Sequence, residues 1–215
     1  MFRIIFLIFL ASLLHAGEWI KKYALATGLD FAITRGDFDG FSRVHSGEKS
    51  VPESVILPEV PFFLVYAFDA RALANASSIA LNFGIGFPEY EHKEQSGDAR
   101  YFRIGLEYQY HFLWPEPFRI GIGLGYDFSS MRFPKASVGI GEDGKWSYAN
   151  FTGNGPHAVL SAEYYFTENF AAEGAIRCRL LYLNNVATDL NDVSRLSDAV
   201  WQGMGEFGLR VMLVF

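Results

Sequence analysis

Residues 118–128 have the sequence FRIGIGLGYDF, and this stretch decides the fold. Large apolar side chains occupy every second position from Phe118 to Phe128, whereas Arg119, three glycines and Asp127 lie between them. A period of two predicts a β-strand with one apolar face. Glycine has no side chain to pack and is normally depleted inside strands. The fold therefore depends on which of the two faces points toward a crowded interior.

The same alternation recurs in eight segments, and nothing between them has helical periodicity. The segments span approximately residues 19–34, 55–68, 77–88, 100–112, 118–131, 155–166, 170–183 and 201–215. The connections alternate strictly in length, with long ones at 35–54, 89–99, 132–154 and 184–200 and short ones at 69–76, 113–117 and 167–169. An antiparallel up-and-down sheet with both termini at the short-turn end gives this pattern. Outer-membrane barrels have the same asymmetry, with short periplasmic turns and longer extracellular loops.

The volume of the apolar side chains indicates which face points outward. The apolar faces of the eight segments hold far more large side chains than the roughly twelve that fill the interior of a comparable parallel barrel. An eight-stranded barrel interior is only just wide enough for side chains to fill. The large apolar residues must therefore face outward, which only lipid tolerates over so large an area. The opposite faces carry mainly glycine, alanine, serine and charged residues, which suit a narrow lumen.

The sequence thus predicts an all-β, eight-stranded antiparallel transmembrane β-barrel. The barrel must be closed, because open strand edges in hydrocarbon leave backbone groups unpaired at several kcal/mol each. A β-sandwich is the alternative, since a core between two sheets absorbs more apolar side chains than a small barrel does. A soluble barrel with an apolar interior fails the volume argument above.

The N-terminus has the composition of a secretory signal peptide. Residues 1–16, MFRIIFLIFLASLLHA, combine an early arginine with an apolar stretch and small residues near the end. The alternative is a membrane anchor helix, for which the stretch is too short. We therefore expect a signal peptide over residues 1–16 and one barrel domain over residues 17–215. The single cysteine, Cys178, excludes a disulfide within the chain, so we expect an exported protein without disulfides. The net charge of −6 argues against nucleic-acid binding.

In architecture the whole mature chain resembles the small outer-membrane β-barrels of Gram-negative bacteria, such as the OmpA transmembrane domain, OmpX and OmpW. The most specific element is the C-terminal GLRVMLVF, residues 208–215. Its terminal Phe215, with Leu213 and Val211 alternating before it, is similar to the signal that the barrel-assembly machinery recognises. Family members often have glycine where this chain has Arg210. The resemblance implies integral insertion in the outer membrane and partners in outer-membrane lipid and the assembly machinery.

Charged residues on the inward faces are the candidate functional residues. The basic ones are Arg103, Arg119, Arg177, Arg179 and Arg210, and the acidic ones are Asp30, Glu59, Glu107, Asp127, Glu163, Glu173 and Glu206. Unpaired buried charge is costly, so we expect these groups to pair within the lumen. The network is interpreted as a structural filling of salt bridges. The alternative is a narrow ion path, in which rings of charge set selectivity.

Three function classes follow from this sequence. We expect a structural or surface-interaction barrel whose four long loops contact an extracellular ligand, without cofactor, metal or catalytic activity. A narrow channel for small solutes or ions is the alternative, because inward glycines at 84, 86, 105, 121, 123, 125, 174 and 208 leave space. A lipid-modifying enzyme is the third class and requires a Ser–His pair in contact. His157 and Ser161 share an inward face but lie too far apart along one strand, at about 3.4 Å per residue.

Overall fold

The structure of the chain is a computed structural model. It describes residues 22–36, 54–68, 76–87, 89–92, 95–98, 100–113, 117–134, 148–188 and 193–215. The predicted signal peptide lies outside these residues, so its prediction stays untested. Among the described residues, no helix is long and apolar enough to cross a membrane.

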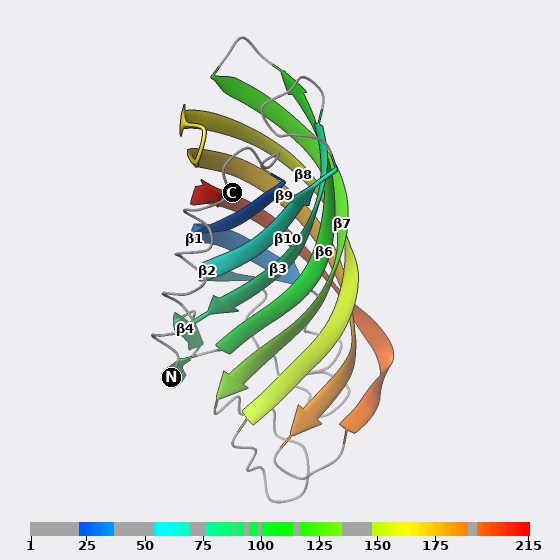
Figure 1. Cartoon of the computed structure of the whole chain (residues 1–215). Coiled ribbons are helices and arrows are strands. Elements are labelled where there is room, and N and C mark those ends of the chain that lie inside the picture. The colour runs from blue at the N-terminus through cyan, green and yellow to red at the C-terminus, as the bar shows by residue number, and fades with distance from the viewer. Residues whose placement is uncertain are drawn as a thin grey trace, which may run out of the picture.

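The described residues form ten strands, and eight of them close into one antiparallel barrel (Figure 1). The barrel strands are β1 (Tyr23–Gly36), β2 (Ser54–Ala67), β3 (Ala76–Gly86), β6 (Arg100–Leu113), β7 (Phe118–Pro134), β8 (Tyr148–Thr167), β9 (Phe170–Thr188) and β10 (Val193–Val214). Strands β4 (Glu89–His92) and β5 (Gln95–Asp98) pair only with each other, as a hairpin in the connection between β3 and β6. Each barrel strand pairs with its neighbours in sequence, and β1 closes the barrel by pairing with β10. The eight-stranded up-and-down prediction is confirmed, and the β-sandwich is excluded.

Several strands extend further toward the long connections than the hydrophobic pattern predicts. Strand β8 begins at Tyr148 rather than near residue 155, and β10 begins at Val193 rather than near residue 201. The predicted long loop at 89–99 also contains the β4–β5 hairpin. The difference has a physical reason on β8, where the inward side chains stay buried but outward positions such as Asn150 and Asn154 are polar. The alternation of hydrophobicity therefore covers only part of the strand.

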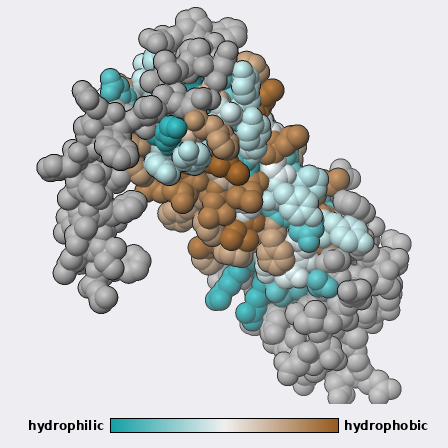
Figure 2. All heavy atoms as spheres, turned by 45° about the vertical axis from the view of Figure 1, so that its right-hand side comes forward, coloured by the Kyte–Doolittle hydropathy of each residue, from teal (hydrophilic) through white to brown (hydrophobic). Residues whose placement is uncertain are grey.

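The large apolar side chains point outward, as predicted. On β7, Phe118, Ile122 and Leu124 are exposed, whereas Arg119 and Asp127 are buried. Figure 2 shows the result on one face of the molecule, where a hydrophobic band is bordered at both edges by hydrophilic residues. An apolar exterior around a polar interior is the distribution found in membrane-spanning barrels.

One sequence-based placement is wrong. Gly174 was expected in the lumen but lies on the outward face of β9, because its neighbours Glu173 and Ala175 are the buried ones. Tyr101 is an aromatic residue on the inward face of β6. Its ring is 2 % exposed, and its hydroxyl lies 4.0 Å from the sulfur of Met204.

The lumen is filled in three layers along the barrel axis. Near the short turns an apolar cluster contains Ala24, Ala26, Phe63, Val65, Ala80, Ala171, Met212 and Val214, with Tyr165 packed against it. The middle layer holds the charged residues. Toward the long connections, buried and mostly apolar side chains follow, namely Leu57, Tyr101, Met131, Phe151, Leu181, Leu183 and Met204. Apolar side chains thus lie toward both ends of the lumen, and at the short-turn end they share it with the charged residues Arg119 and Glu163.

Candidate functional site

The candidate site is the charged middle layer of the lumen. All twelve predicted residues are buried: Asp30, Glu59, Arg103, Glu107, Arg119, Asp127, Glu163, Glu173, Arg177, Arg179, Glu206 and Arg210. They come from every barrel strand except β3, and each occupies an inward position of the two-residue alternation. The structure places all twelve side chains inside the barrel, and their contacts follow below.

Arg103 on β6 is the centre of the first group. Its guanidinium is fully buried and forms an ion pair with Glu59 on β2. Its Nη1 donates to the side-chain oxygen of Asn82 at 2.6 Å and lies 3.6 Å from Asp127 Oδ1. A charged donor fork that contacts acceptors on several strands ties those strands together.

His157 on β8 joins this group to the next. Its Nδ1 lies 2.6 Å from Asp127 Oδ2, and its Nε2 lies 2.9 Å from Glu107 Oε2. Arg179 on β9 shares the Asp127 carboxylate through Nε at 2.9 Å and also pairs with Glu206. Because both imidazole nitrogens face carboxylate oxygens, the geometry fits a ring that carries both hydrogens.

Arg177 binds Glu107 through two parallel contacts. Its Nε donates to Oε2 at 2.7 Å, and its Nη2 donates to Oε1 at 2.9 Å. Bidentate geometry of this kind is stronger and more directional than a single charged hydrogen bond. The same guanidinium lies 3.6 Å from both Glu173 and Glu206, so that it links the carboxylates of β6, β9 and β10.

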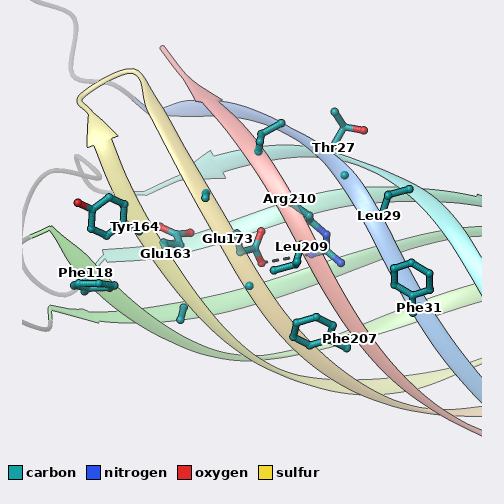
Figure 3. Close-up of a pocket in the computed structure, with 15 residues that line it drawn as sticks. Thr27, Leu29, Phe31, Phe118, Glu163, Tyr164, Glu173, Phe207, Leu209 and Arg210 are labelled. Atoms are coloured by element: carbon teal, nitrogen blue, oxygen red, sulfur yellow. Dashed lines mark hydrogen bonds and ion pairs between the residues drawn. The ribbon is translucent and has the colours of Figure 1, made fainter.

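Arg210 on β10 spans the closure between the first and last strands. It forms a two-point interaction with Asp30 on β1 and lies 3.4 Å from Glu173 Oε1 on β9. Figure 3 shows this Arg210–Glu173 contact between neighbouring strands. The guanidinium carbon also lies 4.1 Å from the ring centroid of Phe63, a cation–π distance that joins the charged layer to the apolar cluster below it.

A separate polar group lies nearer the short turns, and sequence analysis missed its arrangement. The Ser78 hydroxyl lies 3.1 Å from Nε2 of His111, whose Nδ1 lies 3.8 Å from Glu163 Oε1. Arg119 Nη1 lies 3.9 Å from Glu163 Oε2. Inward position was predictable for Ser78 and His111, but their contact depends on the register between β3 and β6. His157 and Ser161 do not contact each other, because His157 binds carboxylates and Ser161 donates to Gln109 at 2.8 Å.

Inward glycines provide the room for these charged groups. A Cβ built on Gly125 would collide with the His157 ring, and one on Gly105 would collide with the Asp127 carboxylate. Both glycines are the direct register partners of the residues they accommodate. The predicted space inside the barrel is therefore already occupied by side chains from the neighbouring strand.

The buried charges are close to balanced. Five arginines face seven carboxylates, and His111 and His157 each lie near a carboxylate. When both imidazoles are protonated, cations and anions are equal in number. Among the described residues, no group of three or more His, Cys, Asp or Glu side chains is arranged to hold a metal ion.

The outward face carries a hollow of about 570 Å³ over β8, β9, β10 and β1 (Figure 3). Its floor includes the small residues Ala162, Ala172 and Gly174, and its walls include Phe118 and Leu209. Cys178 lies further along the same outward face of β9 and is exposed, as the alternation predicts. Most of its lining belongs to the apolar band, and the inward residues Glu163, Glu173 and Arg210 also contribute to it.

Comparison with solved structures supports the fold. The chain is similar to Neisserial surface protein A, with a TM-score of 0.58, 14% identity and coverage of 90% of this chain and 97% of that one. It is similar to the outer membrane protein OprG of Pseudomonas aeruginosa, with a TM-score of 0.52, 13% identity and coverage of 93% and 98%. It is also similar to Ail, the attachment invasion locus protein of Yersinia pestis, with a TM-score of 0.52, 11% identity and coverage of 92% and 100%. No family model matches the sequence, and no curated protein matches it either. At these identities the likeness establishes a small outer-membrane barrel fold.

Proposed function

We propose that this protein is an integral outer-membrane barrel whose lumen is closed and whose extracellular loops perform its function by contacting other surfaces or molecules. The apolar outward band and the fold shared with small outer-membrane barrels support the location. The barrel is proposed to have no catalytic activity and no cofactor. Nucleic acid is not proposed as a partner, because the chain is acidic.

One observation carries the proposal of a closed lumen: the buried charged groups contact each other across the lumen, and apolar side chains are buried toward both of its ends. A conducting path needs continuous polar or water-filled space. Here Phe63, Val65 and Met212 fill the lumen at one end of the charged layer, and Phe151, Leu181 and Leu183 fill it at the other. The charged groups between them are engaged with each other.

Planar-bilayer recording of the refolded mature chain, residues 17–215, tests this proposal. We expect no discrete conductance steps from the wild-type barrel. Phe63→Ala is the matched variant, because it removes a ring from the apolar cluster next to Arg210. Leakage of ions through this variant would show that inserted barrels can be detected in the recording. Stable steps from the wild type, with a selectivity that changes in Arg119→Glu, would contradict a closed lumen and favour the channel.

A second candidate function rests on the contact between Ser78 and His111. A serine hydroxyl near an imidazole whose other nitrogen approaches a carboxylate is the arrangement of an activated nucleophile. The substrate class would be an acyl ester of a membrane lipid. The 3.8 Å separation of His111 and Glu163 and the burial of Ser78 favour a structural hydrogen bond instead.

Acyl-ester hydrolysis by the refolded barrel separates these two roles. We expect no release of fatty acid from phospholipid or lipid A micelles above the level of the Ser78→Ala variant. Ser161→Ala is the matched control, because it removes a buried lumen hydroxyl that contacts Gln109 rather than a histidine. Turnover that disappears in Ser78→Ala but persists in Ser161→Ala would establish an enzyme.

A further inference from the structure

The outward face of β8 becomes polar where the strand continues toward the long connections. Ala158 is an apolar outward position within the apolar band, whereas Asn150, Thr152 and Asn154 occupy the outward positions nearer the long connections. These three polar side chains are partly exposed. Asn154 is the direct register partner of Phe128, which ends the apolar outward run of β7. The polar positions therefore begin at the boundary of the apolar band and extend away from it.

Two hydroxyl groups of β7 orient the asparagine amides of β8. The Tyr126 hydroxyl donates to the side-chain oxygen of Asn154 at 2.5 Å, and the Ser130 hydroxyl donates to that of Asn150 at 2.8 Å. Because each amide oxygen accepts a hydrogen bond from β7, each amide nitrogen remains a donor, and each hydroxyl oxygen remains an acceptor. The surface therefore carries two pairs of groups, and each pair combines a donor with an acceptor.

Aromatic rings adjoin these polar groups. Asn154 lies between Phe128 on β7 and Tyr182 on β9, which are its direct register partners on the two sides. Phe128 is 45% exposed, and the ring of Tyr126 is 56% exposed on the same outward face. An exposed aromatic ring offers a flat apolar surface beside the hydrogen-bonding groups. Amides, hydroxyls and aromatic rings are neutral, so this arrangement suits a neutral, hydroxyl-rich ligand with an apolar face.

Sugar rings have these chemical properties. Each sugar hydroxyl both donates and accepts hydrogen bonds, and the C–H groups on one face of the ring pack against an aromatic side chain. Asn150 and Asn154 are four residues apart on one strand, which places them about 14 Å apart, so a headgroup with more than one sugar ring reaches both. Beside the polar groups, the apolar band provides the surface along which acyl chains lie.

We infer that this surface, formed by Tyr126, Phe128, Ser130, Asn150 and Asn154, binds the saccharide headgroup of an outer-leaflet glycolipid. The occupant is a glycolipid and not a free sugar, because the polar groups directly adjoin lipid-facing side chains. A headgroup whose acyl chains already lie in the bilayer loses less translational freedom when it binds. The inference rests on the outer-membrane location and on the extracellular position of the long connections, and it is independent of whether the lumen is closed.

Binding is measured on the barrel refolded in a zwitterionic phosphocholine detergent, which contains no sugar, and native mass spectrometry counts the retained lipid. The first probe is digalactosyl diacylglycerol, a neutral glycolipid. Dioleoylglycerol lacks the sugar, and dioleoyl phosphatidic acid carries a phosphate in its place. We expect the wild-type barrel to retain the glycolipid in preference to both other lipids.

Tyr126→Phe and Tyr108→Phe are a matched pair of variants. Tyr126→Phe keeps the ring but removes the hydroxyl that orients Asn154, whereas Tyr108→Phe removes an exposed hydroxyl of β6 within the apolar band. We expect Asn154→Ala to weaken glycolipid binding about tenfold and Tyr126→Phe about threefold, as for the loss of one neutral hydrogen bond. Tyr108→Phe should leave binding unchanged.

Four other results would overturn the inference, each in a different way. Equal retention of the glycolipid and dioleoylglycerol would mean that acyl chains alone are bound, and stronger retention of phosphatidic acid would mean recognition of charge. Competition by free methyl galactoside at concentrations similar to those of the glycolipid would assign the surface to soluble sugars. Equal weakening in Tyr126→Phe and Tyr108→Phe would exclude a specific role for the oriented amide.

Insertion of the barrel into lipid vesicles is measured separately, by its folded mobility on unheated gels. Failure to insert would contradict the membrane location on which the inference rests. Normal insertion without preference for the glycolipid would contradict the glycolipid surface alone.

Discussion

At the scale of single residues, glycines on one strand make room for large inward side chains on the neighbouring strand. At three positions the register partner of a charged or bulky inward side chain is glycine: Gly105 faces Asp127, Gly125 faces His157 and Gly208 faces Asp30. Glycine costs entropy and packs poorly inside strands. It is retained here because a Cβ at these positions would overlap the partner's charged group.

Gly125→Ala tests whether glycine is needed at position 125 to accommodate the His157 ring. Its Cβ would collide with the His157 ring and lie 2.5 Å from the Leu106 carbonyl oxygen, so we expect destabilisation of about 1–3 kcal/mol. Gly205→Ala is the matched control on β10, because nothing lies within 4 Å of its Cβ position. Urea unfolding in lipid vesicles measures both. Equal stabilities for the two variants would show that the His157 contact does not depend on Gly125.

Removing one charge from the lumen is expected to cost much more than removing a surface charge. Arg103→Met leaves Glu59 and Asp127 without their shared cation in a buried site, which should lower the free energy of unfolding by about 3–5 kcal/mol. The exposed Arg100→Gln should change it by less than about 0.5 kcal/mol. In the double variant Arg103→Met, Glu59→Gln, part of the loss should return, because one stranded carboxylate becomes neutral. No recovery in that variant would argue against direct pairing.

At the scale of the element, each strand is a two-sided surface with lipid on one side and the charged lumen on the other. Strand β7 illustrates this division, since Leu124 is 68% exposed while Asp127, three positions further on, is fully buried. A substitution therefore acts through the face on which it lies and through its depth in the bilayer.

Leu124→Arg tests this dependence on depth. Leu124 lies near the middle of the outward apolar run of β7, so an arginine there should cost about 2–4 kcal/mol. Phe128→Arg, at the end of the same run, should cost about 0–1 kcal/mol because it lies near the interface. The comparison uses urea titration in vesicles of one composition. Equal costs at the two positions would contradict the placement of the apolar band.

The strands themselves were predictable because alternation is strong wherever one face contacts lipid. The prediction failed where that signal stops: the outward face of β8 is polar around Asn150 and Asn154, so the first part of the strand resembled a loop. The inward positions of the charged residues were also predictable, because they follow from the two-residue alternation along each strand. Their pairing was not, since contacts such as Arg103 with Glu59 depend on registers between strands that no local pattern specifies.

At the scale of the whole molecule, the C-terminal residues both complete the barrel and form its predicted assembly signal. Phe215, Leu213 and Val211 project outward, and Phe215 exchanges backbone hydrogen bonds with Tyr23 at 2.9 and 3.0 Å. The Phe215 ring stacks on Tyr23 with centroids 6.3 Å apart. The terminus is thus part of the closed wall and also lies at its short-turn edge.

Phe215→Ala separates these two roles. Recognition by the assembly machinery predicts a large drop in the amount of folded barrel in cells, measured by its mobility on unheated gels. Spontaneous refolding into vesicles should be nearly unchanged, since the variant loses only one edge aromatic contact of about 0.5–1.5 kcal/mol. A matched Phe112→Ala variant, at the same edge but within β6, should assemble normally. Equal defects in both variants would mean that Phe215 acts only through stability.

The closure between β1 and β10 has a consequence for the order of events during folding. The Asp30–Arg210 interaction joins residues separated by 180 positions in the chain. Such a link has almost the greatest contact order that this chain allows, and loop-closure entropy must be overcome before it contributes. Neighbouring hairpins can form earlier, but the first strand keeps an open edge until the last strand arrives. We therefore expect barrel closure to be the slow kinetic step, with Asp30 and Arg210 pairing only at that moment.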